Sequence, residues 1–355
     1  MNVPELQAVA SGGGWPACPY RIELTDGSAA ARALPHDVLC AFSYGEGGHD
    51  GDARRVAVPL RPLAHSGAHS GPGAAAASRT ELWRSDLPVR HGRDGEIRWS
   101  ENGEMLMLQL RLEEAELQPL ADAVHHAYRR IGEIIAARGY PELWRVWHYL
   151  GEINQGEGDE ERYRQFCIGR YRALDDHAGF ESRLPAASAI GARGGGLSII
   201  ALAGKLRGLQ VENPRQVSAF RYPRSYGPRS PSFSRATLLP FADGPRLLVS
   251  GTASIVGHAT AHAGDTVAQL RQTAANLDAL LAHAVHTQLP GRRAAEFTAD
   301  SYIVYLRHDE DLPLVLPELR RLFGDTPLQV LAGDVCRPEL LIEIEATYRM
   351  AAAAA

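Results

Sequence analysis

Two hydrophobic periodicities alternate along this chain. Short runs with apolar residues at every second position predict strands, and runs with apolar residues three or four apart predict helices. The longest helical run covers residues 113–138, and its apolar residues fall on one face. Those residues are Leu117, Leu120, Val124, Tyr128, Ile131 and Ile135. Gly139 is expected to end this helix, because glycine adopts the left-handed conformation found just after many helices.

The same rhythm of strands and helices occurs in both halves of the chain. Helices are predicted at 113–138, 159–174, after Asp265 and at 312–323, with Asp265 as an N-cap and Pro313 in the first turn of the last helix. Strands are predicted at 105–112, 143–150, 197–203, 246–250, 301–307, 328–331 and 340–347. This order predicts an α+β fold of two related modules, with mixed β-sheets packed on long helices.

The expected domains are an N-terminal one over residues 1–155, a connecting helix and linker over 156–190, and a second domain over 191–350. Residues 64–78 are rich in Ala, Gly, Ser and His and are expected to form a mobile loop.

Composition narrows the classes of function. The chain has 355 residues, 45% of them hydrophobic, and a net charge of −5, which argues against general nucleic-acid binding. Its four cysteines are widely spaced without a CxxC pair, so neither a zinc site nor a disulfide framework is expected. No apolar run is long enough to cross a membrane, and the N-terminus does not have the pattern of a signal peptide. We therefore expect a reduced, cytoplasmic protein without membrane contact.

The most unusual segment covers residues 213–235. It holds five arginines, two tyrosines and four prolines, and no acidic residue occurs between Glu212 and Asp243. The planar guanidinium group matches a carboxylate through two parallel hydrogen bonds, and proline stiffens a loop. The segment therefore suits the binding of a small molecule with several negative charges, although a solvated basic loop would have the same composition.

A second candidate site lies in the predicted strand 340–347. Successive side chains of a strand point to opposite faces, so Leu340, Ile342, Ile344 and Ala346 share one face. Glu343 and Glu345 share the other. A solvated strand face would also show this pattern. Cys336 lies just before the strand, and an isolated cysteine of this kind is usually a small buried apolar residue.

Several longer motifs resemble those of known families. The C-terminal half resembles the RidA/YjgF family through Leu-Val-Ser-Gly-Thr-Ala-Ser at 248–254, the helix at 265–277, Tyr-Ile-Val-Tyr-Leu at 302–306 and Ile-Glu-Ile-Glu-Ala at 342–346. With the arginine-rich segment and Cys-Arg-Pro-Glu-Leu-Leu-Ile-Glu at 336–343, the whole chain resembles the chorismatases. Within that family it is most similar to the branch that supplies 3- and 4-hydroxybenzoate for xanthomonadin pigments and ubiquinone.

The resemblance implies a reaction and a set of residues. The substrate would be chorismate, whose enolpyruvyl ether is cleaved to pyruvate plus a hydroxybenzoate, without a metal or an organic cofactor. Glu343 would be the acid, because RidA-like enzymes place theirs at the first glutamate of the Glu-Ile-Glu motif. Cys336 would shape the pocket, exclude water or relay a proton, and an aliphatic residue at that position marks the branch that forms a dihydroxycyclohexadienoate.

The expected binding residues surround this acid. Substrate contacts are predicted for Arg215, Arg221, Tyr222, Tyr226, Arg229, Gly251, Ala253 and Arg307. The arginines would hold the two carboxylates, since an unpaired buried carboxylate is costly. The tyrosines would donate to substrate oxygens or would pack on neighbouring prolines. Gly251 and Ala253 would leave room in the wall of the pocket.

Three other functions are compatible with parts of the sequence. A RidA-type imine hydrolase would need an arginine about where Leu328 stands, which counts against that activity. A non-enzymatic module that binds an aromatic acid has the same sequence features but would not need Glu343. Nucleic-acid binding is disfavoured by the negative net charge. A monomer and a homotrimer are both compatible with the sequence, because a duplicated module could replace part of a trimer interface.

Overall fold

A computed structural model of the chain describes residues 15–26, 33–45, 51–66, 79–176 and 179–351. Its first module contains β6 (Arg90–Asp94), β7 (Ile97–Glu101), β8 (Met105–Leu112), α2 (Leu120–Arg138), β9 (Glu142–Gly151), α3 (Arg162–Asp175), β10 (Ala186–Ala192) and β11 (Leu197–Gly204). The six strands form one sheet in the order β10-β9-β11-β8-β7-β6. Of these pairs, β9 and β10 run parallel.

The second module repeats this arrangement. It contains β12 (Leu209–Val211), β13 (Ala236–Leu239), β14 (Arg246–Ala253), α4 (Thr266–Gln288), β17 (Phe297–Leu306), α5 (Leu312–Phe323), β18 (Leu328–Ala332) and β19 (Ile342–Met350). Its strand order is β12-β13-β14-β19-β17-β18. This matches the first sheet read from its other end, β6-β7-β8-β11-β9-β10, strand for strand. The expected pair of related α+β modules is therefore confirmed by topology.

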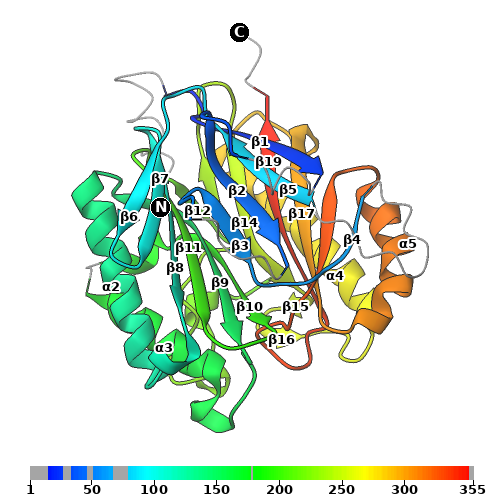
Figure 1. The fold of residues 1–355 in the computed structure, drawn as a ribbon. Helices are drawn as coiled ribbons and strands as arrows, with labels where there is room; N and C mark the ends of the chain where they lie inside the picture. Colours follow the sequence, from blue (N-terminus) through cyan, green and yellow to red (C-terminus); the bar gives the residue numbers. More distant parts are fainter. Residues whose placement is uncertain (1–14, 27–32, 46–50, 67–78, 177–178, 352–355) are drawn as a thin grey trace.

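The helices cover the outer faces of the two sheets, and the inner faces pack together. In Figure 1, α2 and α3 lie on one side of the molecule and α4 and α5 on the other. Ile199 and Ala201 of β11 belong to the core beneath α2 and α3, and Ile342 and Ile344 of β19 belong to the core beneath α4 and α5. A third core joins the inner faces; it includes Trp147, Tyr149, Leu202, Ile303 and Tyr305.

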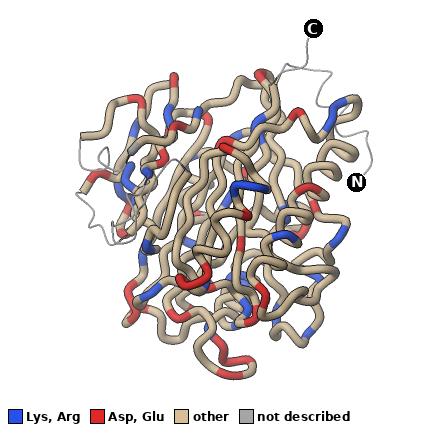
Figure 2. The backbone as a smooth tube through the Cα atoms, turned by 90° about the vertical axis from the view of Figure 1, so that its right-hand side faces the viewer, with Lys and Arg blue, Asp and Glu red and all other residues tan. Residues whose placement is uncertain are grey.

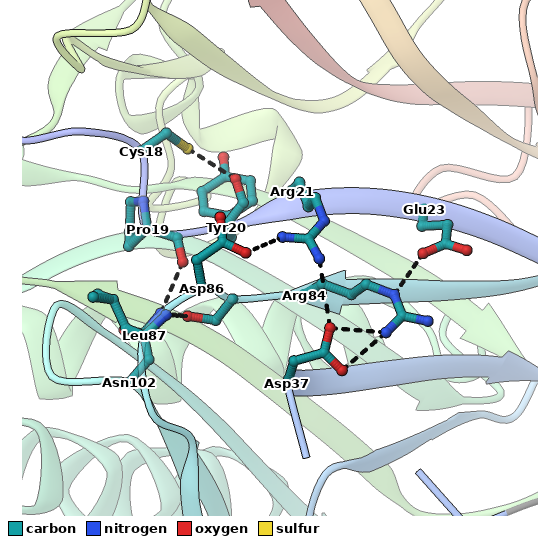
Figure 3. A network of polar contacts seen from close by, with 11 residues as sticks. Cys18, Pro19, Tyr20, Arg21, Glu23, Asp37, Arg84, Asp86, Leu87 and Asn102 are labelled. Carbon is teal, nitrogen blue, oxygen red and sulfur yellow. Dashed lines mark hydrogen bonds and ion pairs between the residues drawn. The ribbon is translucent and has the colours of Figure 1, made fainter. Parts of the chain in front are cut away.

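A separate four-stranded sheet lies N-terminal to both modules. Its strands are β1 (Arg21–Asp26), β2 (Val38–Tyr44), β3 (Arg55–Val58) and β5 (Arg79–Arg84), in the order β1-β5-β2-β3. Figure 3 shows Arg84, the last residue of β5, between Glu23 of β1 and Asp37, which directly precedes β2. The guanidinium group of Arg84 donates hydrogen bonds to both carboxylates and so links the three strands. Asn102 donates to the carbonyl of Pro19 and to Ser85, which ties this sheet to the first module.

Several boundaries differ from those expected. The helix predicted at 113–138 begins at Leu120, after a short 3-10 turn at Glu114–Glu116. Gly139 does follow it in the left-handed conformation, at φ 78°. The domain boundary expected at 191 falls inside the first sheet, because β10 and β11 both pair with β9. The two module sheets separate after residue 204 instead.

The segment expected to be a loop at 64–78 also contains part of a strand. β4 (Pro62–His65) pairs antiparallel with β18 and becomes the seventh strand of the second sheet. Residues 67–78 lie outside the described residues. Two further short strands, β15 (Ile255–Val256) and β16 (Ala259–Thr260), form a hairpin after β14.

Charge is spread over the molecule. Figure 2 shows basic and acidic segments interspersed on the face that it draws, so this face carries no extended basic stripe. Within the described residues, no helix is long and apolar enough to cross a membrane.

Candidate active site

A cavity of about 200 Å³ lies where the two modules meet. The first module contributes Tyr163, Arg164, Phe166, Cys167 and Arg170 from α3 and residues 187–189 from β10. The second module contributes Gly251 and Ala253 from β14, the loop 336–339 and Glu343 from β19. The arginine-rich segment adds Tyr222, Ser225, Tyr226, Pro231, Ser232, Phe233 and Arg235 to the wall of the cavity. Of the predicted site residues, the cavity brings together Glu343, Cys336, Tyr222, Tyr226, Gly251 and Ala253.

Glu343 is the buried carboxyl group of this cavity. Its strand is central in the second sheet, where Glu343 pairs with Ala253 of β14 and Tyr305 of β17. The side chain is on the inner face, and only 5% of the residue is exposed. The pKa of Glu343 is raised to about 8, mainly by burial and to a smaller extent by the charge of Glu345, while Arg145 and Arg235 oppose the shift. The carboxyl group is therefore protonated at neutral pH and can donate that proton.

Gly251 provides the space for this carboxyl group. A Cβ atom at Gly251 would overlap Oε1 of Glu343 and would also press on Oγ of Ser188. The strand is irregular here, with a register shift between Val249 and Thr252. The backbone N–H of Gly251 donates to Ser188 Oγ at 2.9 Å, which holds the glycine against β10. The absence of a side chain at position 251 thus determines where the acid can lie.

Glu345 is also buried, but it lies in a different environment from Glu343. It accepts hydrogen bonds from Arg145, from Ser188 Oγ at 2.6 Å and from Trp147 Nε1 at 3.1 Å. Arg145 in turn donates to Ser188 at 2.6 Å. Glu345 does not line the cavity. Of the two neighbouring carboxyl groups, therefore, that of Glu343 faces the cavity and that of Glu345 is held in an ion pair with Arg145.

Three buried arginines surround the cavity without an acidic partner. Arg170, Arg235 and Arg337 are each less than 9% exposed, and no described acidic group forms an ion pair with any of them. Their guanidinium groups retain buried nitrogens that have no hydrogen-bond partner among the described residues: Nε and Nη2 of Arg170, Nε of Arg235 and Nη2 of Arg337. Buried donors of this kind are normally satisfied, so the arrangement suits an anionic ligand.

The two predicted tyrosines position these arginines. Tyr222 OH accepts from Arg235 Nη2 at 2.8 Å, and the guanidinium carbon of Arg337 lies 3.9 Å from the ring centroid of Tyr226. Tyr226 OH is 3.3 Å from Nδ1 of His258. Aromatic faces attract guanidinium groups, so the tyrosines hold the positive charges in place and also border the cavity.

The other predicted anchors lie elsewhere. Arg215, Arg221 and Arg229 are exposed and do not line the cavity. Arg307 donates to Asp334, Asn154 and the carbonyls of Val335, Arg337 and Leu340, so it braces the loop before β19. Local composition could not separate these arginines from Arg235 and Arg337, because burial depends on contacts far along the chain.

Sequence reasoning missed the contribution of α3. Tyr163, Cys167 and Arg170 recur at helical spacing on one face of this helix, together with buried Phe166. The presence of a tyrosine, a thiol and an arginine on one otherwise apolar face could have indicated a site on this helix. Nothing in the local sequence, however, showed that β19 lies opposite it.

Cys336 and Cys167 are both free thiols in the wall of the cavity. The pKa of Cys336 is raised to about 12, mainly by burial, while Arg337 opposes the shift. A neutral thiol is a poor nucleophile. No group of three or more His, Cys, Asp or Glu side chains in the described part of the chain is placed to hold a metal ion.

This geometry defines a class of protein: a duplicated α+β chain whose modules enclose a cavity. The cavity holds a carboxylic acid and several arginines that have no acidic partner in the described part of the chain, which suits proton transfer to a small anion. Residues 81–203 match the family description Chorismatase FkbO/Hyg5-like, N-terminal. The chain is 38% identical over 275 residues to a 3-hydroxybenzoate synthase of Streptomyces hygroscopicus, covering 75% of this chain and 80% of that protein.

Two further comparisons cover more of the chain. A chorismatase of Streptomyces rapamycinicus is 36% identical over 327 residues, covering 86% of this chain and 96% of its own. A chorismatase crystal structure matches with a TM-score of 0.80 and 31% identity, covering 93% of this chain and 99% of that one. The chain belongs to the chorismatase family.

Proposed function

We propose that this protein cleaves the enolpyruvyl ether of chorismate to pyruvate and a hydroxybenzoate, with 3-hydroxybenzoate, 4-hydroxybenzoate or both as products. The observation that carries the proposal is the buried Glu343, whose pKa is raised to about 8, in the same cavity as three arginines that have no acidic partner among the described residues. Chorismate has two carboxylates, a hydroxyl group and an enol ether. Its charges complement those arginines, and its enol ether needs a proton. The relative named 3-hydroxybenzoate synthase supports this class of product.

Glu343 is assigned as the proton donor. Protonation of the methylene carbon of the enolpyruvyl group produces an oxocarbenium ion. The bond between the ether oxygen and the ring carbon can then break, with its electrons forming the carbonyl group of pyruvate. The ring cation that remains becomes aromatic when it releases a ring proton. A carboxyl group whose pKa is raised by burial is a suitable acid near neutral pH. The substrate carboxylates would be held by Arg170, Arg235 and Arg337, which replace the earlier candidates Arg215, Arg221, Arg229 and Arg307.

The overall reaction adds no external reactant. Pyruvate and hydroxybenzoate together have the atomic composition of chorismate, so the oxocarbenium ion can break down to these products without an added nucleophile. A small cavity with a neutral thiol at Cys336 and bulky Phe166 and Tyr163 in its wall limits access of water to that ion. All these residues come from one chain, so a monomer would carry a complete site. We place the reaction in the cytoplasm.

The test is incubation of the purified protein with chorismate, with pyruvate measured enzymatically and aromatic products resolved by chromatography. We expect equimolar pyruvate and hydroxybenzoate from the wild-type protein, and both products formed at least about 10²-fold more slowly by Glu343→Gln. Pyruvate with a non-aromatic diol would place the chain in the hydrolytic branch. Absence of pyruvate release would refute the assignment.

A further inference from the structure

The duplicated fold gives Glu343 a positional counterpart in the first module. Glu343 lies on β19, opposite Ala253 of β14 and Tyr305 of β17. On β11, Ser198 lies opposite Arg111 of β8 and Tyr149 of β9. Since β11 and β19 hold the same place in their sheets, Ser198 occupies the position that the acid occupies in the second module.

The orientation of the two positions agrees as well. The neighbours of Ser198 in sequence, Leu197 and Ile199, point into the core beneath α2 and α3, as Ile342 and Ile344 point into the core beneath α4 and α5. The hydroxyl groups of the equivalent Tyr149 and Tyr305 lie 3.5 Å apart where the inner faces meet. Ser198 therefore faces the interior of the molecule on the same side of its sheet as Glu343.

Ser198 lines a second cavity, of about 730 Å³, that is built like the first one. The last residue of β10 and the loop after it contribute residues 192–195, just as the loop between β18 and β19 contributes 336–339 to the active site. The opposite wall comes from residues 57–62, which connect the N-terminal sheet to β4. The second module forms the active-site cavity together with the first module. At the equivalent place, the first module forms the second cavity together with the N-terminal segment.

The lining of this second cavity combines positive charge with apolar surface. It includes Arg61, Arg111 and Arg193, the hydroxyl-bearing Tyr149 and Ser198, and the apolar Pro59, Leu60 and Ala332. None of the described residues that line it is acidic. Among the described residues, Asp309 pairs with Arg61 and lies 3.7 Å from Arg193, and Glu113 pairs with Arg111, so Arg61 and Arg193 share one acid.

Arg193 is the cation most available to a ligand. Its side chain is 73% exposed, and its ion pair with Asp309 is long. A carboxylate entering the cleft could therefore recruit Arg193 at little cost, while a planar apolar body would contact Pro59, Leu60 and Ala332. Ser198 can hydrogen-bond to such a ligand but cannot supply a proton to carbon as a carboxylic acid can, since a hydroxyl group is a far weaker acid.

We propose that this second cavity is a non-catalytic binding site for a small aromatic carboxylate. The choice of a hydroxybenzoate as its ligand rests on the proposed function; the site itself rests on the equivalence of Ser198 and Glu343 and on the lining of the cleft. Binding there leaves the ligand unchanged and is separate from turnover in the active site.

The experiment counts ligands per chain. Equilibrium dialysis with labelled 3-hydroxybenzoate should show two bound at saturation in the wild-type protein. Arg193→Glu should reduce this to one without changing the initial rate with chorismate, because the variant alters only the second cavity. Arg337→Ala should also leave one, but with the rate reduced. Arg129→Glu, at an exposed arginine on the outer helix α2, should keep both.

A bound count that Arg193→Glu does not lower below that of the wild-type protein would overturn the proposal, whether the wild-type count is one or two. The measurement does not depend on the reaction. If chorismate gave no pyruvate while the binding counts changed as expected, the proposed function would fail and the second site would stand.

Discussion

Gly251 and Glu343 lie so close together across neighbouring strands that a methyl group on the glycine would overlap Oε1 of the acid. Gly251→Ala should therefore displace the carboxyl group from its position in the cavity. We expect kcat/KM for chorismate to fall by about 10²-fold, which is the loss seen when a general acid is misplaced. Gly132→Ala is the matched control, since nothing lies within 4 Å of a Cβ at that position in α2.

Circular dichroism and thermal unfolding should show both glycine variants folded. Wild-type kinetics in Gly251→Ala would mean that Glu343 can move freely and that its observed position is not needed for the reaction.

The two neighbouring glutamates should respond differently to substitution. Glu343→Gln keeps the shape of the side chain but removes the proton, so kcat should fall by about 10²–10⁴-fold while chorismate binding is largely retained. Glu345→Gln should cost much less in kcat, because Glu345 acts through Arg145 and Ser188 rather than on substrate. Single-turnover kinetics and ligand titration separate the two effects. A dead Glu345→Gln enzyme with an active Glu343→Gln enzyme would reverse the assignment.

The pH dependence of activity follows from the acid. Because the pKa of Glu343 is raised to about 8, the protonated form predominates below that pH and is lost above it. We expect kcat/KM to be constant through neutral pH and to fall about tenfold per pH unit above the pKa. Glu345→Gln removes a charge that raises this pKa, so its profile should bend at lower pH. A profile that rises through pH 8 would require a base in place of the acid.

Stability should also depend on Glu343. Its pKa in the folded protein, about 8, exceeds the ordinary value of 4.5 for the unfolded chain, so the folded state binds the extra proton between these values. The contribution to the free energy of unfolding is therefore complete below pH 4.5 and is lost as pH rises toward 8, at about 1 kcal/mol per pH unit. Denaturant titrations from pH 5 to 8 should show a flatter dependence for Glu343→Gln than for wild type.

The arginine assignments can be tested within one helix and one loop. Arg170→Ala should weaken chorismate binding by about 2–5 kcal/mol, because a buried carboxylate would lose its partner. Arg172→Ala on the same helix removes an exposed arginine paired with Asp122 and should bind normally. Arg221→Ala and Arg229→Ala should also retain KM and kcat. Strong defects in these two with a silent Arg170→Ala would restore the original loop anchors.

Part of the candidate site could be predicted from the sequence alone. The face of the strand that carries Glu343 and Glu345 was predictable, since alternation with Ile342, Ile344 and Ala346 leaves no other arrangement. That both carboxyl groups would be buried was not, because the solvated alternative has the same pattern. Their burial depends on β9 and β10 of the other module, which pack against this face and supply Arg145 and Ser188.

The missed elements share a physical cause. β4 pairs with β18 more than 260 residues away, and Arg170 meets Glu343 in a cavity that spans both modules. Local periodicity reports on the face of an element that will be buried and not on its partner. Helices such as Leu312–Phe323, which carry their own end signals, were correspondingly well predicted.

The covalent joining of two modules also bears on how such a site can change over generations. In an assembly of identical subunits, a substitution of the acid appears in every site at once, and activity is lost everywhere. Here one gene segment encodes β11 and another encodes β19, so position 198 can hold a serine while position 343 holds a glutamate. Each cleft is then free to diverge under its own selection, one for chemistry and the other for whatever it binds.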